Sequence, residues 1–433
     1  MIDIKKLLDQ PDVFEKAAKL KGVSVDINFI IEGKTKQNQL QKECDDLRHE
    51  VNAASKNKPD AETIQKLKST KEQIKKLEDT IRDIDEKIMQ ELCKIPNPPF
   101  ADVPIGKDDS ENVVLRKWGK IPEFDFELKD HVELGEELNM IDIERAAKVT
   151  GSRFYYLKGA AVWIQFALLQ YAYRILTDKE EIEKIAGSVE KGHSTNVFEP
   201  VLPPVMIRPE MYTKMARLSD ADKDEKYHLA QDDMYLIGSA EHTLGPMHAD
   251  EVLDEKDLPI RYVGFSTAFR REAGSYGKDV RGILRVHQFD KIEMESFTVP
   301  EDSLKEQEFF VKIQERLLQG LEIPYQIVAV CTGDMGKPDA QQIDVECWMP
   351  AQKKYRETHS ADLMTDYQSR RLNTRVRRKN GEFEFVHIND ATVFAIGRTL
   401  IAIMENYQKK DGSIEIPKVL QPFMPLKKII VKN

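Results

Sequence analysis

The chain has 433 residues, 41% of them apolar, and a formal net charge of −10. Its length and apolar content allow a large core and more than one domain. No run of about 18 apolar residues occurs, so we expect no membrane span, and residues 1–6 do not resemble a secretory signal. The negative charge argues against nucleic-acid binding by bulk charge alone, but it does not exclude a local basic face.

The four cysteines lie far apart and form neither a C-x-x-C pair nor a zinc-ligand spacing with histidine. The histidines likewise lack a metal-binding pattern such as H-E-x-x-H. We therefore expect a cytoplasmic protein without structural zinc, with its thiols reduced.

Residues 1–96 are predicted to form a helical domain with a long antiparallel coiled-coil arm. Apolar residues recur at steps of three and four in two stretches, separated by the polar segment 55–60, which includes Pro59. Helices of roughly 30 residues would extend about 45 Å. The pattern alone also fits a dimerisation or spacer coiled coil, although Arg48, Lys56 and Lys58 could contact phosphates of a nucleic acid. The two stripes comprise Leu40, Cys44, Leu47, Val51 and Ala54, and Ile64, Leu67, Ile74, Leu77, Ile81, Ile84 and Ile88.

A proline cluster at residues 95–99 ends the arm, and residues 97–120 are predicted to be a linker. Residues 121–433 are predicted to form an α+β core with a mostly antiparallel sheet flanked by helices. Short helices are expected around residues 134–149 and a longer apolar helix over residues 158–177. The β-rich runs follow one another too closely for parallel crossovers; they are Arg261–Phe265, Ile283–Val286, Lys291–Phe297, Tyr325–Cys331 and Ile343–Trp348.

Two segments carry arginine where it could bind phosphate. In Phe269–Ser275, Arg270 can make a bidentate contact, Glu272 shares its face of the strand, and Phe289 on the return strand could stack on a base. Arg398 lies at the predicted start of a helix, where free N–H groups and the helix dipole favour anions. Each segment alone also fits an ordinary basic hairpin or a solvated helix end.

Glu241 and Glu293 stand among apolar residues. A buried carboxylate is costly unless it is paired. The two residues could hold the ammonium group of an amino acid, or each could form a structural salt bridge with a nearby arginine.

Taken together, these segments resemble the seryl-tRNA synthetase family of class II aminoacyl-tRNA synthetases over essentially the whole chain. The opening M-I-D-I-K-K-L-L with its hairpin is similar to the family's tRNA-binding arm, and A-A-K-V-T-G-S-R-F at residues 146–154 is characteristic of the family. The three class II motifs follow in order, at residues 198–206, 269–289 and 397–408.

The resemblance implies a binding site for ATP. Arg270 would bind the α-phosphate and Arg398 the γ-phosphate, while Phe289 would stack on adenine. The segment 357–360 would contact ATP, and the oxygens of its first and last residues would coordinate Mg²⁺. The implied ATP-binding residues are Arg270, Arg271, Glu272, Val286, Phe289, Glu357, Thr358, His359, Ser360 and Arg398, with Glu357 and Ser360 as the Mg²⁺ ligands.

The resemblance also implies a serine pocket. Ser239, Ala240 and Glu241 stand where the family has Thr-Ala-Glu and would hold the ammonium group, while Glu293 and Thr392 would hold the rest of the substrate, including its hydroxyl. The chain departs from the family at Ala361-Asp362-Leu363 and at Asp390-Ala391, beside this pocket.

The implied activity is adenylation of L-serine by ATP and transfer to the 3′-terminal adenosine of tRNA-Ser, with tRNA-Sec as a further candidate, by a homodimer that associates through the segment 198–206. One alternative is a paralogue that loads a carrier protein. Such relatives typically lack the long arm. The other alternative is an inactive RNA-binding paralogue, in which residues such as Arg270, Arg398 or Glu357 would be lost.

Overall fold

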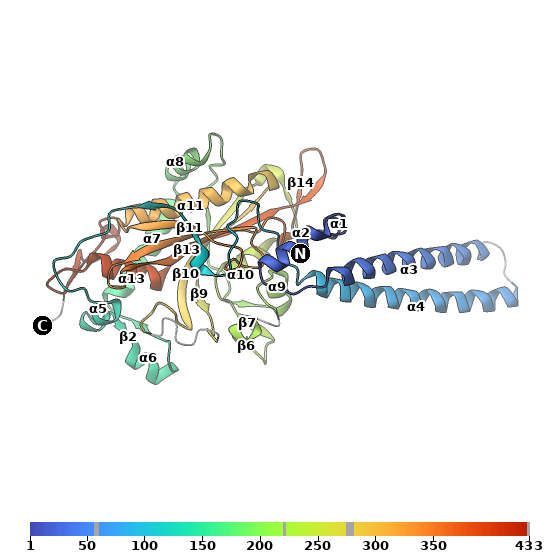
Figure 1. The fold of residues 1–433 in the computed structure, drawn as a ribbon, viewed down its shortest axis with the longest axis horizontal. Helices are drawn as coiled ribbons and strands as arrows, with labels where there is room; N and C mark the ends of the chain where they lie inside the picture. The colour runs from blue at the N-terminus through green and yellow to red at the C-terminus, as the bar shows by residue number, and fades with distance from the viewer. Residues whose placement is uncertain (56–59, 220–221, 274–280, 431–433) are drawn as a thin grey trace. The chain divides into compact units, whose positions relative to one another are not determined.

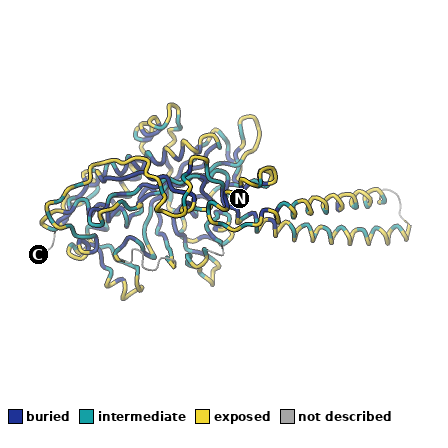
Figure 2. The backbone as a smooth tube through the Cα atoms, viewed as in Figure 1, coloured by how far each residue is buried: buried dark blue, intermediate teal, exposed yellow. Residues whose placement is uncertain are grey.

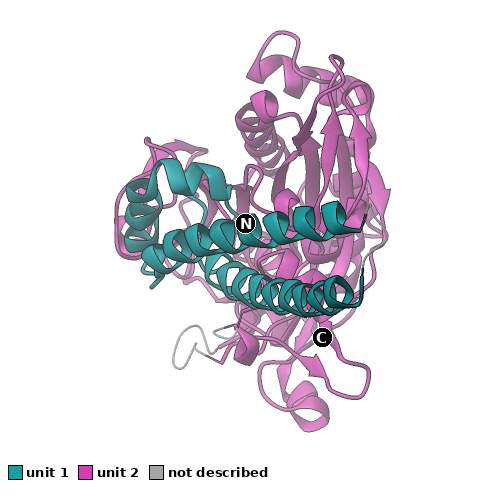
Figure 3. Cartoon of the chain, turned by 90° about the vertical axis from the view of Figure 1, so that its right-hand side faces the viewer, with its two compact units in different colours: residues 1–98 teal, residues 99–433 magenta. Residues whose placement is uncertain are grey.

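The computed structural model describes the chain except for residues 56–59, 220–221, 274–280 and 431–433. The chain divides into two compact units, residues 1–98 and residues 99–433, coloured separately in Figure 3. Within the described residues, no helix is long and apolar enough to cross a membrane.

The first unit is helical, and two long helices dominate it. Asp26 caps α3 by accepting from the Phe29 N–H, and Asp60 caps α4 by accepting from the Thr63 N–H. Lys56 and Lys58, predicted to contact tRNA, lie outside the described residues. The helices are α1 (Ile4–Asp9), α2 (Pro11–Leu20), α3 (Ile27–Ala54) and α4 (Ala61–Leu92).

The predicted antiparallel hairpin is confirmed. Cys44 and Ile88 are buried, and Gly33 lies so close to Ile88 that a methyl group at Gly33 would be 3.0 Å from its side chain. Farther out the facing apolar residues are only partly buried, and Figure 2 shows α3 and α4 largely half-buried or exposed. Arg48, a predicted tRNA contact, pairs across the hairpin with Glu78 at 2.7 Å.

An eight-stranded sheet forms the centre of the second unit (Figure 1), in the order β1-β11-β12-β13-β16-β10-β9-β4. All its neighbouring strands are antiparallel except β4 and β9, which confirms the predicted α+β fold. Its strands are β1 (Val113–Trp118), β4 (Glu199–Val201), β9 (Ile260–Phe269), β10 (Gln288–Thr298), β11 (Tyr325–Ala329), β12 (Gln341–Met349), β13 (Lys354–Leu363) and β16 (His387–Ala395).

Three long helices pack against this sheet and supply much of its core. The α11 side chain Gln314 donates to the backbone carbonyls of Ser360 and Thr392, which ties β13 to β16 directly behind the site described below. The helices are α7 (Ala160–Thr177), α11 (Ser303–Gly320) and α13 (Ile396–Tyr407).

Smaller elements complete the second unit. They are α5 (His131–Glu137), β2 (Ile141–Asp142), α6 (Ile143–Thr150), β3 (Tyr156–Leu157), α8 (Lys179–Val189), β5 (Met206–Ile207), α9 (Pro209–Lys214), β6 (His228–Leu229), β7 (Met234–Leu236), α10 (Glu241–Leu244), β8 (Val252–Asp254), α12 (Ser369–Leu372), β14 (Arg375–Arg377), β15 (Phe383–Phe385), β17 (Ile414–Glu415) and β18 (Lys428–Ile429).

Two sequence expectations differ from the structure. Residues 283–286 were expected to form a strand, but they form turns whose apolar side chains fill the core, and β10 begins only at Gln288. Gly282 has a positive φ of 82°, and the Ile283 N–H donates to the ring of His131 instead of to a neighbouring strand. The range 97–120, expected to be a linker, contains β1, which pairs with β11 at the sheet edge.

Candidate active site

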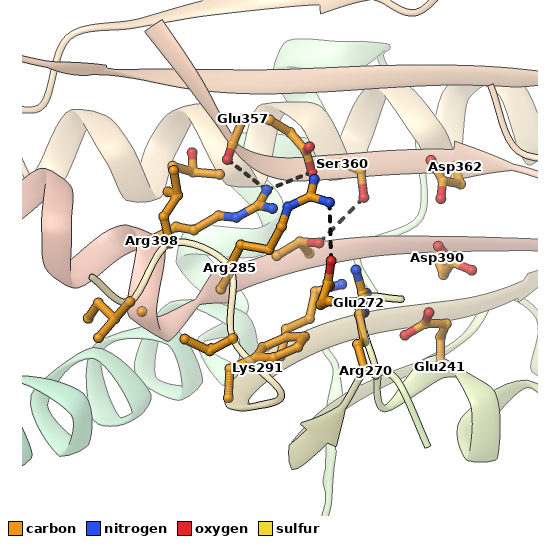
Figure 4. Close-up of a pocket in the computed structure, with 18 of the residues that line it drawn as sticks. Glu241, Arg270, Glu272, Arg285, Lys291, Glu357, Ser360, Asp362, Asp390 and Arg398 are labelled. Atoms are coloured by element: carbon orange, nitrogen blue, oxygen red, sulfur yellow. Dashed lines mark hydrogen bonds and ion pairs between the residues drawn. The ribbon is translucent and has the colours of Figure 1, made fainter. Parts of the chain in front are cut away.

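A cavity of about 200 Å³ lies on the face of the sheet formed by β10, β13 and β16 (Figure 4). Its lining residues come from segments that are distant in sequence but adjacent in the sheet. They are Arg217, Glu241, Arg270, Glu272, Ile283, Leu284, Arg285, Val286, Phe289, Lys291, Gln342, Glu357, Thr358, Ser360, Asp362, Asp390, Thr392, Ala395, Gly397 and Arg398.

Arg270 follows the last residue of β9, and Phe289 lies near the start of β10. Antiparallel pairing of these strands brings the two side chains together, so that the Arg270 guanidinium lies 5.2 Å from the centre of the Phe289 ring. The Arg270 Nε donates to the Gly238 carbonyl at 3.1 Å. These contacts hold a cation at the cavity wall beside an aromatic face.

Glu272 lines the cavity and accepts from Arg285 Nη1 at 3.1 Å. Its φ of +52° lies in the left-handed region, which is uncommon for a residue with a side chain. Val286 also lines the cavity. Arg271 does not line it, and its N–H donates to the Glu225 carbonyl.

Arg398, in the first turn of α13, lies at one end of the cavity and contacts Glu357 twice. Its Nη1 is 2.9 Å from the Glu357 carbonyl oxygen and 3.1 Å from the carboxylate. Burial opposes ionisation of Glu357, but Arg398 outweighs it and lowers the pKa of that carboxyl group. The N-cap residue Ala395 offers no side-chain cap, so the helix start presents backbone N–H groups at the cavity.

Residues 357–360 of β13 do not all face the cavity. Glu357, Thr358 and Ser360 line it, whereas His359 is buried in the core against the Phe394 ring, 5.8 Å away. Burial lowers the pKa of His359 to about 3, so its ring is neutral at physiological pH. His359 was predicted to contact ATP, but its side chain does not line the cavity.

Thr392 lines the cavity beside Ser360, with their hydroxyl oxygens 3.4 Å apart, and Glu293 is buried outside the lining. The Glu293 carboxylate is paired with Lys291, and its Oε1 accepts from Ser239 at 3.0 Å and from Thr392 at 3.3 Å. Ser239 and Ala240 are fully buried and outside the lining. Of the five residues predicted to hold serine, Glu241 and Thr392 line the cavity, and Lys291, which was not predicted, lines it too and pairs with Glu293.

Glu241, the first residue of α10, lines the end of the cavity that lies away from Arg398 (Figure 4). Burial opposes its ionisation, but surrounding groups that include Lys291 and Arg217 hold its pKa below the ordinary value. An anionic carboxylate at this position can accept from an ammonium group.

Some lining residues were not predicted from the sequence. Arg217 follows α9 and belongs to no motif, so no local signal could have identified it. Asp362 and Asp390 were noticed only as departures from a family pattern, and Lys291 and Arg285 lie within quoted segments without an assigned role. Only pairing of the strands reveals that these side chains share one cavity.

Two family models match this chain. The family "Seryl-tRNA synthetase N-terminal domain" matches residues 1–99, and "tRNA synthetase class II core domain (G, H, P, S and T)" matches residues 225–407. The chain is 40% identical to the serine–tRNA ligase of Dictyoglomus turgidum, with 100% of both chains covered. It is 39% identical to that of Nitrosopumilus maritimus, covering 98% of this chain and 99% of the relative.

Solved structures agree in fold. The seryl-tRNA synthetase of Pyrococcus horikoshii complexed with ATP superposes with a TM-score of 0.89 at 37% identity, over 100% of each chain. The cytoplasmic serine–tRNA ligase of Naegleria fowleri in complex with AMP gives a TM-score of 0.83 at 29% identity, over 98% of this chain and 96% of that one. With both family domains, the three motifs and full-length relatives in agreement, this chain belongs to the seryl-tRNA synthetase family.

Proposed function

We propose that this protein activates L-serine with ATP to form seryl-adenylate and then transfers the seryl group to the 3′-terminal adenosine of tRNA-Ser. The observation that carries the proposal is one cavity lined by Arg270, Arg398, Glu241 and Thr392, with Arg398 at one end and Glu241 at the other (Figure 4). Such a cavity can hold a nucleotide triphosphate and a small amino acid side by side.

The arginines define the ATP end. During adenylation the serine carboxylate attacks the α-phosphorus, and pyrophosphate leaves. Negative charge develops on the phosphoryl oxygens, and Arg270 stabilises it while Arg398 holds the γ-phosphate. Phe289 stacks on adenine, and Glu272 and the Val286 backbone read its edge.

Mg²⁺ belongs to the same proposal. Glu357 and Ser360 offer a carboxylate and a hydroxyl oxygen on one edge of β13, and Mg²⁺ typically binds through one or two carboxylates together with substrate phosphates. The ion would neutralise charge on the phosphates.

The amino-acid end holds serine through three groups. Glu241 accepts from the ammonium group, and the Thr392 hydroxyl meets the serine hydroxyl. Glu293 fixes Thr392 from beneath, where it accepts the Thr392 hydrogen bond.

We further infer a cytoplasmic homodimer that binds tRNA through its helical arm. On α7, Trp163 and Phe166 are 49% and 47% exposed. This helix packs against β4, which lies within the segment 198–206 that was predicted to form the dimer interface. Exposed aromatic residues of this kind are typical of interfaces.

Serine-dependent ATP–pyrophosphate exchange, followed by charging of tRNA-Ser, tests the function. We expect exchange with serine to exceed exchange with alanine by at least about a hundredfold, because a site built around a hydroxyl strands its own polar groups when the hydroxyl is missing. Exchange without charging of any tRNA would favour the carrier-loading alternative, and absence of exchange would favour the RNA-binding one.

A further inference from the structure

The sheet places two rows of polar side chains on the face that bears the cavity. The first row is Ser360, Thr392 and Glu293, on β13, β16 and β10, and hydrogen bonds join its members at 3.4 and 3.3 Å. The second row, two residues farther along each strand, is Asp362, Asp390 and Glu295. Register pairs Asp362 with Asp390 and Glu295 with Asp390. Two residues of extended chain separate the rows by about 7 Å.

The second row is open to the same cavity as the first. Asp362 and Asp390 line the cavity, whereas Glu295 is fully buried outside the lining. Arg217 also lines it and lies 3.3 Å from Asp390. Figure 4 shows Asp362, Asp390 and Glu241 close together at the end of the cavity away from Arg398.

The carboxyl groups of the second row have few hydrogen-bond donors and one cation among their partners. Asp362 is only 8% exposed, and its Oδ1 has no hydrogen-bond partner among the described residues. Neither carboxylate oxygen of Glu295 has a partner there either. Burial raises the pKa of Asp390 to about 8 despite the opposing charge of Arg217. One guanidinium therefore stands against three buried carboxyl groups, an arrangement that costs free energy unless a donor binds.

Serine leaves these groups unused. A serine hydroxyl held at Thr392 ends at the first row, which leaves the second row beyond its reach. A side chain that extends farther with a positively charged donor would meet Asp362 directly and would relieve the charge imbalance.

We propose that the amino-acid pocket has a second compartment, formed by Asp362, Asp390 and Arg217, that accepts the side-chain ammonium of a small diamino acid. The substrate is 2,4-diaminobutyrate, whose side chain is one methylene longer than that of serine and which the enzyme adenylates in addition to serine. This inference rests on the proposed function, because it places the new substrate in the same site.

Pyrophosphate exchange with serine, 2,4-diaminobutyrate, 2,3-diaminopropionate, homoserine and alanine tests the inference. We expect 2,4-diaminobutyrate to support exchange well above alanine, homoserine and 2,3-diaminopropionate, because the ammonium group of 2,3-diaminopropionate reaches no farther than the serine hydroxyl. Homoserine matches the reach of diaminobutyrate without its charge, so equal exchange with the two would show that the compartment selects length alone and would overturn the proposal. Normal exchange with serine and none with 2,4-diaminobutyrate would also overturn it and leave the proposed function intact. No exchange with any amino acid would instead refute the proposed function.

Variants separate a direct contact from a general charge effect. Asp362→Asn keeps the shape and leaves the Arg217–Asp390 pair in place. It should lower kcat/KM for the diamino acid relative to serine by about tenfold or more, the effect of losing a hydrogen bond to a charged group. Glu295→Gln removes a carboxylate of the same row outside the cavity and should change that ratio by less than about threefold. Equal effects of the two variants, or no effect of Asp362→Asn, would contradict the assignment.

Discussion

Arg398 occupies a position in which it can serve either the protein or the substrate. Its guanidinium contacts both the carbonyl and the carboxylate of Glu357. Phosphate oxygens can replace these acceptors, and the helix start beside Arg398 adds N–H groups to the same region. The arginine is thus held in place before the triphosphate arrives, which reduces the free energy needed to orient it.

Replacing this arginine tests the assignment. Arg398→Ala should lower serine-dependent pyrophosphate exchange by about 10²–10³, the scale of losing one preorganised electrostatic contact. Arg398→Lys retains the charge but loses the planar fork, so its exchange rate should fall between the two. A near-normal rate for Arg398→Ala in a folded protein would remove this residue from the mechanism.

Asp390 links the pocket to the stability of the fold. Its folded-state pKa of about 8 lies above the ordinary value, mainly because of burial. The unfolded chain therefore loses this proton at lower pH than the folded chain does, and the contribution of Asp390 to stability falls as pH rises toward 8.

The variant Asp390→Asn removes this titration at constant shape. Relative to the unmodified protein, its free energy of unfolding should increase by up to about 1.4 kcal/mol for each pH unit from about pH 5 to pH 8, so that the variant becomes relatively more stable, and then level off. Urea unfolding of both proteins across this range measures the difference. A difference independent of pH would show that Asp390 is ionised throughout.

Residue types and spacing predicted the ATP end better than the serine end. Arg270 and Glu272 follow the end of β9 and Phe289 lies near the start of β10, so the pairing of two strands that are neighbours in sequence brings these residues to one cavity. Arg217, Asp362 and Asp390 come from three segments, and only the pairing of β13 with β16 brings the two aspartates together. Strand register of this kind is a tertiary property that local sequence does not determine.

At the level of elements, the arm was the most predictable part. Its seven-residue repeat is a local signal, and α3 and α4 follow it closely. The apolar run 283–286 was misjudged because an apolar run can pack in a core without pairing as a strand. The positive φ of Gly282, directly before this run, could not be inferred from composition.

The arm should serve transfer and not adenylation. Near its base the Gln37 side chain donates to Asp85 across the hairpin at 2.9 Å, so replacing residues 38–84 with a short glycine–serine turn preserves this pair. We expect the shortened protein to retain pyrophosphate exchange and to lose most tRNA charging, because the arm would position the acceptor end. Equal loss of both activities in a folded protein would contradict a role confined to tRNA.

For the whole molecule, the exposed face of α7 determines whether the chain can act alone. The buried side of this helix packs in the core, yet Trp163 and Phe166 on its other side remain about half exposed. In an interface with two-fold symmetry, Trp163 and Phe166 of both subunits would be buried, which makes four aromatic side chains. Burying roughly 100 Å² on each of the four side chains would contribute about 10 kcal/mol at 25 cal/mol per Å². That contribution is comparable to the cost of association, so these aromatic residues should decide whether the dimer forms.

Sedimentation at micromolar concentration provides the test. The unmodified protein should be a dimer, and the double variant Trp163→Glu, Phe166→Glu should be a monomer, because four buried charges without partners would cost more than the interface supplies. Phe383→Glu, at an exposed aromatic residue on β15, should remain dimeric and controls for the added charge. Circular dichroism should show that all three proteins are folded. A dimeric double variant would place the interface on another face, and a monomeric unmodified protein would refute the homodimer itself.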